Sequence, residues 1–136
     1  LSSQAIKGMD LFFSEKTQCA TCHSGFNFSN YSFENNGLYE NYNDVGRYRL
    51  TGDSSDLAKF KIPSLRNVEY TAPYMHDGSI NTLESVIDHY NTGGKDHDNK
   101  SDHVRSLDLS QGEKEALLEF LYSLSDPLFI ANSNFK

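Results

Sequence analysis

The two cysteines of this chain lie three positions apart and are followed at once by a histidine, in the run Cys19-Ala20-Thr21-Cys22-His23. This C-x-x-C-H pattern is typical of covalent attachment of a c-type haem. Two thioether bonds can join Cys19 and Cys22 to the vinyl groups on one edge of a porphyrin, while the imidazole of His23 binds the iron. In a chain of 136 residues, the small core would have to be organised around the porphyrin.

The same cysteine spacing also occurs in disulfides, in thioredoxin-like redox pairs and in zinc sites. A redox pair would follow a strand and precede a long helix, whereas the residues after this motif, Ser24-Gly25-Phe26-Asn27, have a loop composition. A zinc site would need a second pair of ligands at comparable spacing, and the sequence holds no third cysteine. We therefore favour haem attachment.

Two amphipathic helices are expected at the two ends of the chain. Ser3 can cap the first, and its apolar face at i, i+3 and i+4 would carry Ala5, Ile6, Met9, Phe12 and Phe13. Ser110-Gln111-Gly112-Glu113 has the form of a capping box for the last helix, which would extend to Asp126-Pro127. Its apolar face would carry Leu117, Leu118, Leu121 and Leu124. Gly8 costs about 1 kcal/mol against alanine inside a helix, and a close helix crossing would justify it.

Crossed terminal helices beside a haem predict an all-α, cytochrome c-like domain that covers residues 1–136. The formal charge of −7 disfavours nucleic acid as a partner and suits a redox protein that is steered to the surface electrostatically. No apolar run approaches the roughly 18 residues that would span a bilayer. Because no leader precedes Leu1, we expect either a removed signal peptide or a longer parent protein. Because a C-x-x-C-H motif normally receives its haem outside the cytoplasm, we expect a periplasmic or otherwise exported location.

The middle of the chain reads as long loops. Residues 24–59 are rich in Asn, Ser, Gly, Asp and Tyr, and we expect them to be packed by Phe26, Phe28, Tyr31 and Phe33. Loops of this length often wrap a cofactor. Arg47 and Arg66 are candidate partners of the haem propionates. A plain surface position is the alternative for both, although Arg66 is flanked by apolar residues.

Residues 60–79 hold two prolines and end near an Asp-Gly pair, which favours an extended, turning segment. Thr82 can then cap a helix that ends at Asn91-Thr92-Gly93-Gly94. One face of this helix would carry Leu83, Val86, Ile87 and Tyr90.

Residues 60–94, FKIPSLRNVEYTAPYMHDGSINTLESVIDHYNTGG, resemble the C-terminal haem domain of the bacterial di-haem cytochrome c peroxidase and MauG family. The C-x-x-C-H motif combined with "PSLRN" and "TAPYMHDG" is more discriminating than the haem motif alone. The resemblance covers most of the chain and implies a six-coordinate, electron-transferring haem. In the family, a separate N-terminal domain holds the haem that reacts with peroxide. With one haem motif, this chain is expected to act as a peroxidase only together with a second haem domain.

Two residues compete for the iron position opposite His23. On general cytochrome grounds it is Met75, the only methionine after the haem motif. The resemblance implies instead a position on the following helix, which is methionine in the peroxidases and tyrosine in MauG-like members, and which corresponds to Tyr90 here. We favour Tyr90, because it shares the apolar helix face with Val86 and Ile87. A phenolate ligand favours ferric iron, so the reduction potential should be low.

The resemblance also implies calcium between the two domains, bound in part by the backbone carbonyls of Thr71 and Pro73. It places His76 near the interface between the haem domains. A second candidate calcium site, the acidic run 95–103, is disfavoured, because Lys100 stands where an oxygen ligand is needed and no glutamate closes the loop.

Three functions are compatible with the sequence. We favour an electron-transfer domain of a di-haem protein, whose partners are its N-terminal haem domain and a redox protein that donates or accepts electrons. The alternatives are a free-standing monohaem cytochrome c that shuttles electrons, and a redox-silent haem module used for assembly.

Overall fold

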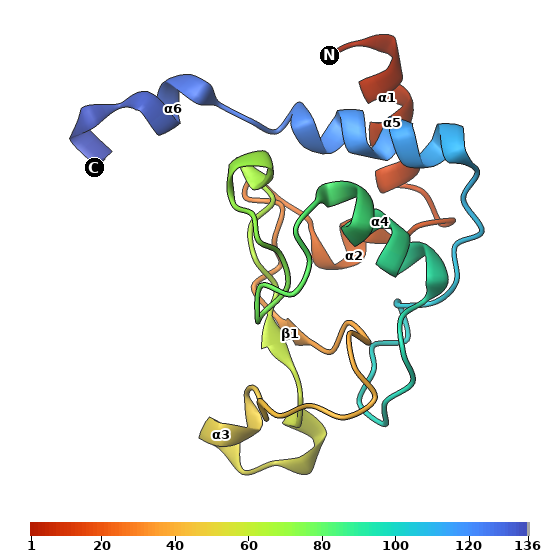
Figure 1. Cartoon of the computed structure of the whole chain (residues 1–136), viewed down its shortest axis with the longest axis vertical. Coiled ribbons are helices and arrows are strands. Elements are labelled where there is room, and N and C mark those ends of the chain that lie inside the picture. The colour runs from red at the N-terminus through yellow and green to blue at the C-terminus, as the bar shows by residue number, and fades with distance from the viewer. Residues whose placement is uncertain (136) are drawn as a thin grey trace.

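The computed structural model describes residues 1–135, which form a mainly helical domain with long connecting segments (Figure 1). The helices are α1 (Ser3–Phe12), α2 (Cys19–Cys22), α3 (Tyr48–Thr51), α4 (Leu83–Thr92), α5 (Gln111–Tyr122) and α6 (Pro127–Ala131). Short 3-10 helices occupy Ser54–Asp56, Val68–Tyr70 and Ser133–Phe135. Strands β1 (Phe33–Glu34) and β2 (Phe60–Lys61) pair antiparallel, with Phe33 opposite Lys61. The predicted helical class is confirmed.

Helices α1 and α5 cross in close contact (Figure 1). Gly8 lies at the crossing, where an added Cβ would overlap the carbonyl oxygen of Ala116 and lie 2.9 Å from the Cβ of Phe120. The rings of Phe12 and Phe120 meet beside it, with centroids 5.1 Å apart. The predicted crossing of the first and last long helices is confirmed, and the absence of a side chain at Gly8 permits it.

The predicted apolar face of α1 is only partly correct. Its buried residues are Ala5, Gly8 and Phe12, whereas Ile6 and Phe13 are 45% and 56% exposed. A helix that crosses α1 at Gly8 covers a narrow strip, so the flanking positions stay at the surface. The predicted cap was also off by one residue, because the hydroxyl of Ser2, not Ser3, accepts the N–H of Ala5 at 3.0 Å.

The other helix boundaries follow from local signals. Ser110 and Glu113 form the predicted capping box at the start of α5. The hydroxyl of Thr82 accepts the N–H of Ser85 at the start of α4, and Gly93 ends that helix with a φ of 84°. However, α5 ends at Tyr122, before the predicted stop, and Asp126 instead caps the short helix α6.

The core lies where α1, α4 and α5 meet. Its buried apolar residues are Phe12, Val68, Leu83, Ile87, Leu107, Leu109, Leu117, Phe120 and Leu121. Each apolar side chain of this kind contributes about 1.5–3 kcal/mol when fully buried. In the part of the chain that the structure describes, no helix is long and apolar enough to cross a membrane.

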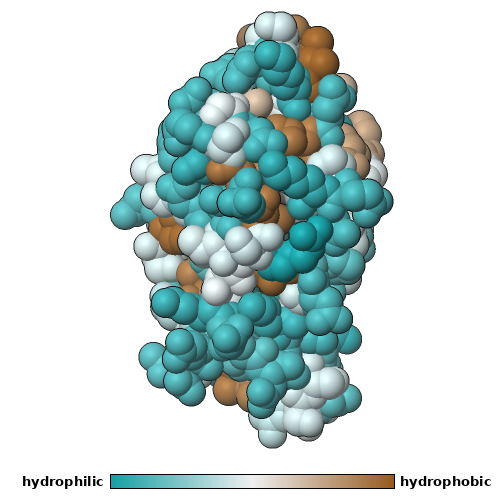
Figure 2. Space-filling view, turned by 90° about the vertical axis from the view of Figure 1, so that its right-hand side faces the viewer, coloured by the Kyte–Doolittle hydropathy of each residue, from teal (hydrophilic) through white to brown (hydrophobic). Residues whose placement is uncertain are grey.

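The aromatic residues of the first long loop do not all pack inward as predicted. Phe28 is half-buried against Phe12 and Phe120, with both centroid distances 6.1 Å. By contrast, Phe26 is 81% exposed and Tyr31 is 54% exposed. A cation covers each of these exposed rings instead, which accounts for aromatic side chains at the surface. The face shown in Figure 2 is mostly hydrophilic, with small separate hydrophobic areas.

Candidate haem site

The segment Cys19–Cys22, expected from its pattern only as an attachment motif, forms the one-turn helix α2. Residues three apart on a helix share a face, so the turn places both thiols on one side. Gln18, with a φ of 52°, redirects the chain into the turn, and the N–H of His23 bonds to the carbonyl of Cys19 at 2.9 Å. Both cysteines are free and half-buried. This is the arrangement that two thioether bonds to one porphyrin edge require.

The imidazole of His23 is oriented by a backbone carbonyl. Its Nδ1 lies 3.0 Å from the oxygen of Phe28. A carbonyl can only accept, so this contact assigns the proton to Nδ1 and leaves the Nε2 lone pair free for a metal. Burial lowers the pKa of His23 despite the carbonyls of Phe28 and Pro63, which act in the opposite sense. The neutral form that a haem ligand needs is therefore favoured.

Tyr90 comes to the same site from α4, and its side chain packs against the same core cluster as Cys19 and Ala20 of α2. Its hydroxyl is close enough to Cys19 and Cys22 for both side chains to act on it electrostatically. Burial raises the pKa of Tyr90, and a hydrogen bond from the side chain of Asn36 opposes that rise. The structure thus brings Tyr90 together with the cysteines, and its role as iron ligand stays a prediction.

Met75 lies in a turn rather than on a helix. Its φ of 73° is unusual for a residue other than glycine. The N–H of Tyr74 bonds to the carbonyl of Ile80 at 2.6 Å and closes the turn. The sulfur of Met75 accepts a hydrogen bond from Nδ2 of Asn36 at 3.2 Å. Both candidate distal ligands therefore lie beside one amide, which the sequence analysis missed, because a single asparagine in an Asn-rich loop carries no signal.

Of the remaining predicted site residues, the side chains of Arg47, Arg66 and Thr71 already have partners in the protein. Nε of Arg47 pairs with Asp56 at 3.0 Å. Arg66 is exposed, contrary to its apolar flanks, and its Nε donates to the carbonyl of Phe26 at 2.7 Å. The hydroxyl of Thr71 donates to a nearby carbonyl, and Pro73 is exposed. Propionate binding by the two arginines and calcium binding at Thr71 and Pro73 stay predictions.

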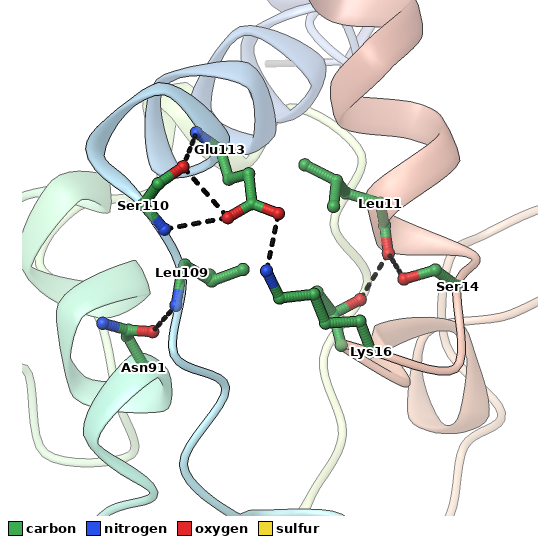
Figure 3. A network of polar contacts seen from close by, with 8 residues as sticks. Leu11, Ser14, Lys16, Asn91, Leu109, Ser110 and Glu113 are labelled. Atoms are coloured by element: carbon green, nitrogen blue, oxygen red, sulfur yellow. Dashed lines mark hydrogen bonds and ion pairs between the residues drawn. The ribbon is translucent and has the colours of Figure 1, made fainter.

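A polar network fixes the segment just before the haem motif (Figure 3). Nζ of Lys16 lies 2.6 Å from Oε1 of Glu113, whose other oxygen accepts from the N–H of Ser110 at 2.8 Å. Nearby, Oδ1 of Asn91, at the end of α4, accepts the N–H of Leu109 at 2.8 Å. The hydrogen bond from Lys16, with those from Ser110, lowers the pKa of Glu113 to about 2. The start of α5 therefore anchors both neighbouring segments.

A separate polar cleft of about 650 Å³ lies between three segments of the chain. It is lined by Glu40, Asn41, Ser54, Ser55, Leu57, Asp96, His97, Asp98 and Asn99. Within residues 1–135, no group of three or more His, Cys, Asp or Glu side chains is placed to hold a metal ion. The cleft lacks the donor set of the cysteine–histidine site.

Two thiols on one helical turn, an oriented imidazole and a buried tyrosine within electrostatic reach of the thiols suit a c-type haem. Together with the crossed helices they define a cytochrome c-type domain. No family model matches the chain. The chain is 37% identical over 126 residues to the methylamine utilization protein MauG of Methylorubrum extorquens, across 91% of this chain and 35% of that protein. It is 35% identical over 157 residues to the cytochrome-c peroxidase IdrP2 of Denitromonas iodatirespirans, across 94% of this chain and 41% of that protein.

A solved structure agrees with these sequence matches. The crystal structure of a MauG-like protein associated with microbial copper homeostasis matches with a TM-score of 0.93 and 36% identity, over 100% of this chain and 51% of that one. The chain belongs to the di-haem cytochrome c peroxidase and MauG family and corresponds to one cytochrome c domain of it. It spans about two-fifths of the length of its curated relatives.

Proposed function

We propose that this chain is the electron-transferring haem domain of a di-haem protein, with His23 and Tyr90 as the axial ligands of one covalent haem. The observation that supports the proposal is that Cys19 of α2 and Tyr90 of α4 pack against one core cluster, with Tyr90 within electrostatic reach of both thiols. When bound, the haem supplies a one-electron iron couple. The protein supplies attachment through Cys19 and Cys22 and holds the imidazole by the carbonyl of Phe28.

Filled axial positions limit what the isolated chain can do. Peroxide needs an open coordination position, and here protein side chains would occupy both. Peroxidase activity would therefore require the second haem domain that the family resemblance implies. The partners would be that N-terminal domain and a redox protein, and covalent haem attachment favours an exported, periplasmic location. Redox-silent use in assembly is the outcome if the iron cannot be reduced.

One observation favours a free-standing electron shuttle as the second candidate. Met75 is half-buried, and its sulfur accepts a hydrogen bond from Asn36, which is also a hydrogen-bond partner of Tyr90. A thioether ligand raises the reduction potential relative to a phenolate, as suits a soluble shuttle. The identity of the distal ligand therefore separates the two candidates.

Peroxide turnover tests the functional assignment directly. The chain, produced with its covalent haem, should consume hydrogen peroxide with a reduced donor at a rate close to that of the donor alone. It should nevertheless accept and release one electron reversibly in a potentiometric titration. Rapid peroxide consumption by the isolated chain would contradict the assignment, and a haem that cannot be reduced would favour the assembly module.

A further inference from the structure

The side-chain amide of Asn36 lies between the two candidate distal ligands. Its Nδ2 donates to Sδ of Met75 over 3.2 Å. The same side chain is also a hydrogen-bond partner of Tyr90. A primary amide nitrogen carries two protons and can serve two acceptors at once. Asn36 thus contacts both residues that compete for the iron.

The backbone at Asn36 is fixed to the helix that carries Tyr90. Nε2 of His89, the residue before Tyr90 on α4, donates to the carbonyl of Asn36 at 2.9 Å. The preceding carbonyl, that of Asn35, accepts the N–H of Ser101 at 3.0 Å. The side chain of Asn35 is fully buried as well. Hydrogen bonds from His89 and Ser101 therefore fix the backbone that carries the Asn36 amide relative to α4.

The hydrogen bond from Asn36 to Met75 is expected to be weaker than a hydrogen bond from Asn36 to a Tyr90 phenolate. A thioether sulfur is a poor hydrogen-bond acceptor, and the hydrogen bond must break before that sulfur lone pair can bind a metal. A phenolate oxygen is a strong acceptor, and charge-assisted hydrogen bonds are roughly twice as strong as neutral ones. The oxygen of Tyr90 can keep a donor while it binds iron, because it has further lone pairs.

We propose that Asn36 is a positioning residue of the distal haem site, whose amide supports the oxygen of Tyr90 and holds the sulfur of Met75 aside, so that Tyr90 reaches the iron. The inference rests on the proposed function, because it assumes a haem bound through His23. It explains why Tyr90 and not Met75 would bind the iron. Asn36 acts through Tyr90 and Met75 and does not itself bind the metal.

The test compares holoproteins that carry the covalent haem. Asn36→Leu keeps the size of the side chain and removes both donors, and Asn41→Leu, at an exposed position, is the matched control. In the ferric Asn36→Leu protein we expect the phenolate-to-iron charge-transfer absorbance to fall by roughly half or more, and the near-infrared band of methionine ligation to appear. Adding Met75→Leu should abolish that near-infrared band. The Asn41→Leu protein should match the wild type.

Asn36→Asp keeps the shape and puts a carboxylate beside the phenolate, so it should move the spectrum in the same direction even if Asn36→Leu does not fold. Melting curves of each variant report structural damage separately. A lowered melting temperature with an unchanged wild-type ferric spectrum would overturn the proposal, because it would make Asn36 a purely structural residue. A wild-type protein that already shows methionine ligation would instead refute the Tyr90 assignment on which the proposal rests.

Discussion

At the scale of single residues, hydrogen bonds orient the side chains of His23 and Met75 in the candidate haem site. The carbonyl of Phe28 sets the tautomer of His23. The amide of Asn36 donates to Met75 and is also a hydrogen-bond partner of Tyr90. The cysteine–histidine motif could be read from sequence because its spacing follows from the porphyrin edge. The role of Asn36 could not be predicted from sequence, because Met75 lies 39 residues further along the chain and Tyr90 lies further still. No local pattern encodes such contacts.

Glu113 offers a residue-scale prediction about pH. Its pKa falls from 4.5 to about 2 in the folded protein, so the folded state binds the proton less readily than the unfolded chain. Its contribution to stability is present above about pH 4.5 and is lost as the pH falls towards 2. The carboxylate is partly exposed, so solvent and salt reduce the effect.

Thermal melts between neutral and acid pH measure this contribution. Glu113→Gln should melt lower than the wild type at neutral pH and show a smaller further loss on acidification. Glu119→Gln, at an exposed position of the same helix, is the control and should follow the wild type. Equal acid sensitivity in the wild type and in Glu113→Gln would contradict the predicted role of the Lys16–Glu113 pair.

At the scale of elements, the caps were predictable and the packing geometry was not. Thr82, Ser110 and Glu113 satisfy N–H groups within their own helix turns, so short sequence patterns specify them. Ile6 and Phe13 fit an apolar stripe but lie at the surface. The part of the apolar face of α1 that becomes buried depends on the angle at which α5 crosses it. The helical spacing of apolar residues in the sequence does not predict that angle.

The crossing of α1 and α5 is tested by adding a side chain at Gly8. Gly8→Val would force the added atoms against the backbone of Ala116, which cannot move without shifting α5. Unfolding by denaturant should show a loss of about 3 kcal/mol or more, at or above the upper end for overpacked sites. The matched control is Gly112→Ala in α5, where nothing lies within 4 Å of an added Cβ.

The control should be neutral or more stable than the wild type by up to about 1 kcal/mol, because alanine is the better helix former. If Gly8→Val were as stable as Gly112→Ala, the two helices could not be in the close contact described here.

At the scale of the whole molecule, the fold brings together groups that the sequence separates. Cys19 and Cys22 lie in the first fifth of the chain, whereas Tyr90 lies on α4 beyond the middle. Cys19 and Tyr90 pack against the same hydrophobic core, which residues of α1, α4 and α5 build. The chain nevertheless spans about two-fifths of its curated relatives, so activity with peroxide is proposed only for a larger assembly.

The ferric absorption spectrum of the holoprotein tests the central claim, a covalent haem bound between His23 and Tyr90, most directly. We expect a phenolate-to-iron charge-transfer band and no near-infrared band of methionine ligation. Tyr90→Phe should abolish the charge-transfer band and give high-spin or five-coordinate iron, while Met75→Leu should change little. A near-infrared methionine band that survives in Tyr90→Phe and vanishes in Met75→Leu would contradict the account.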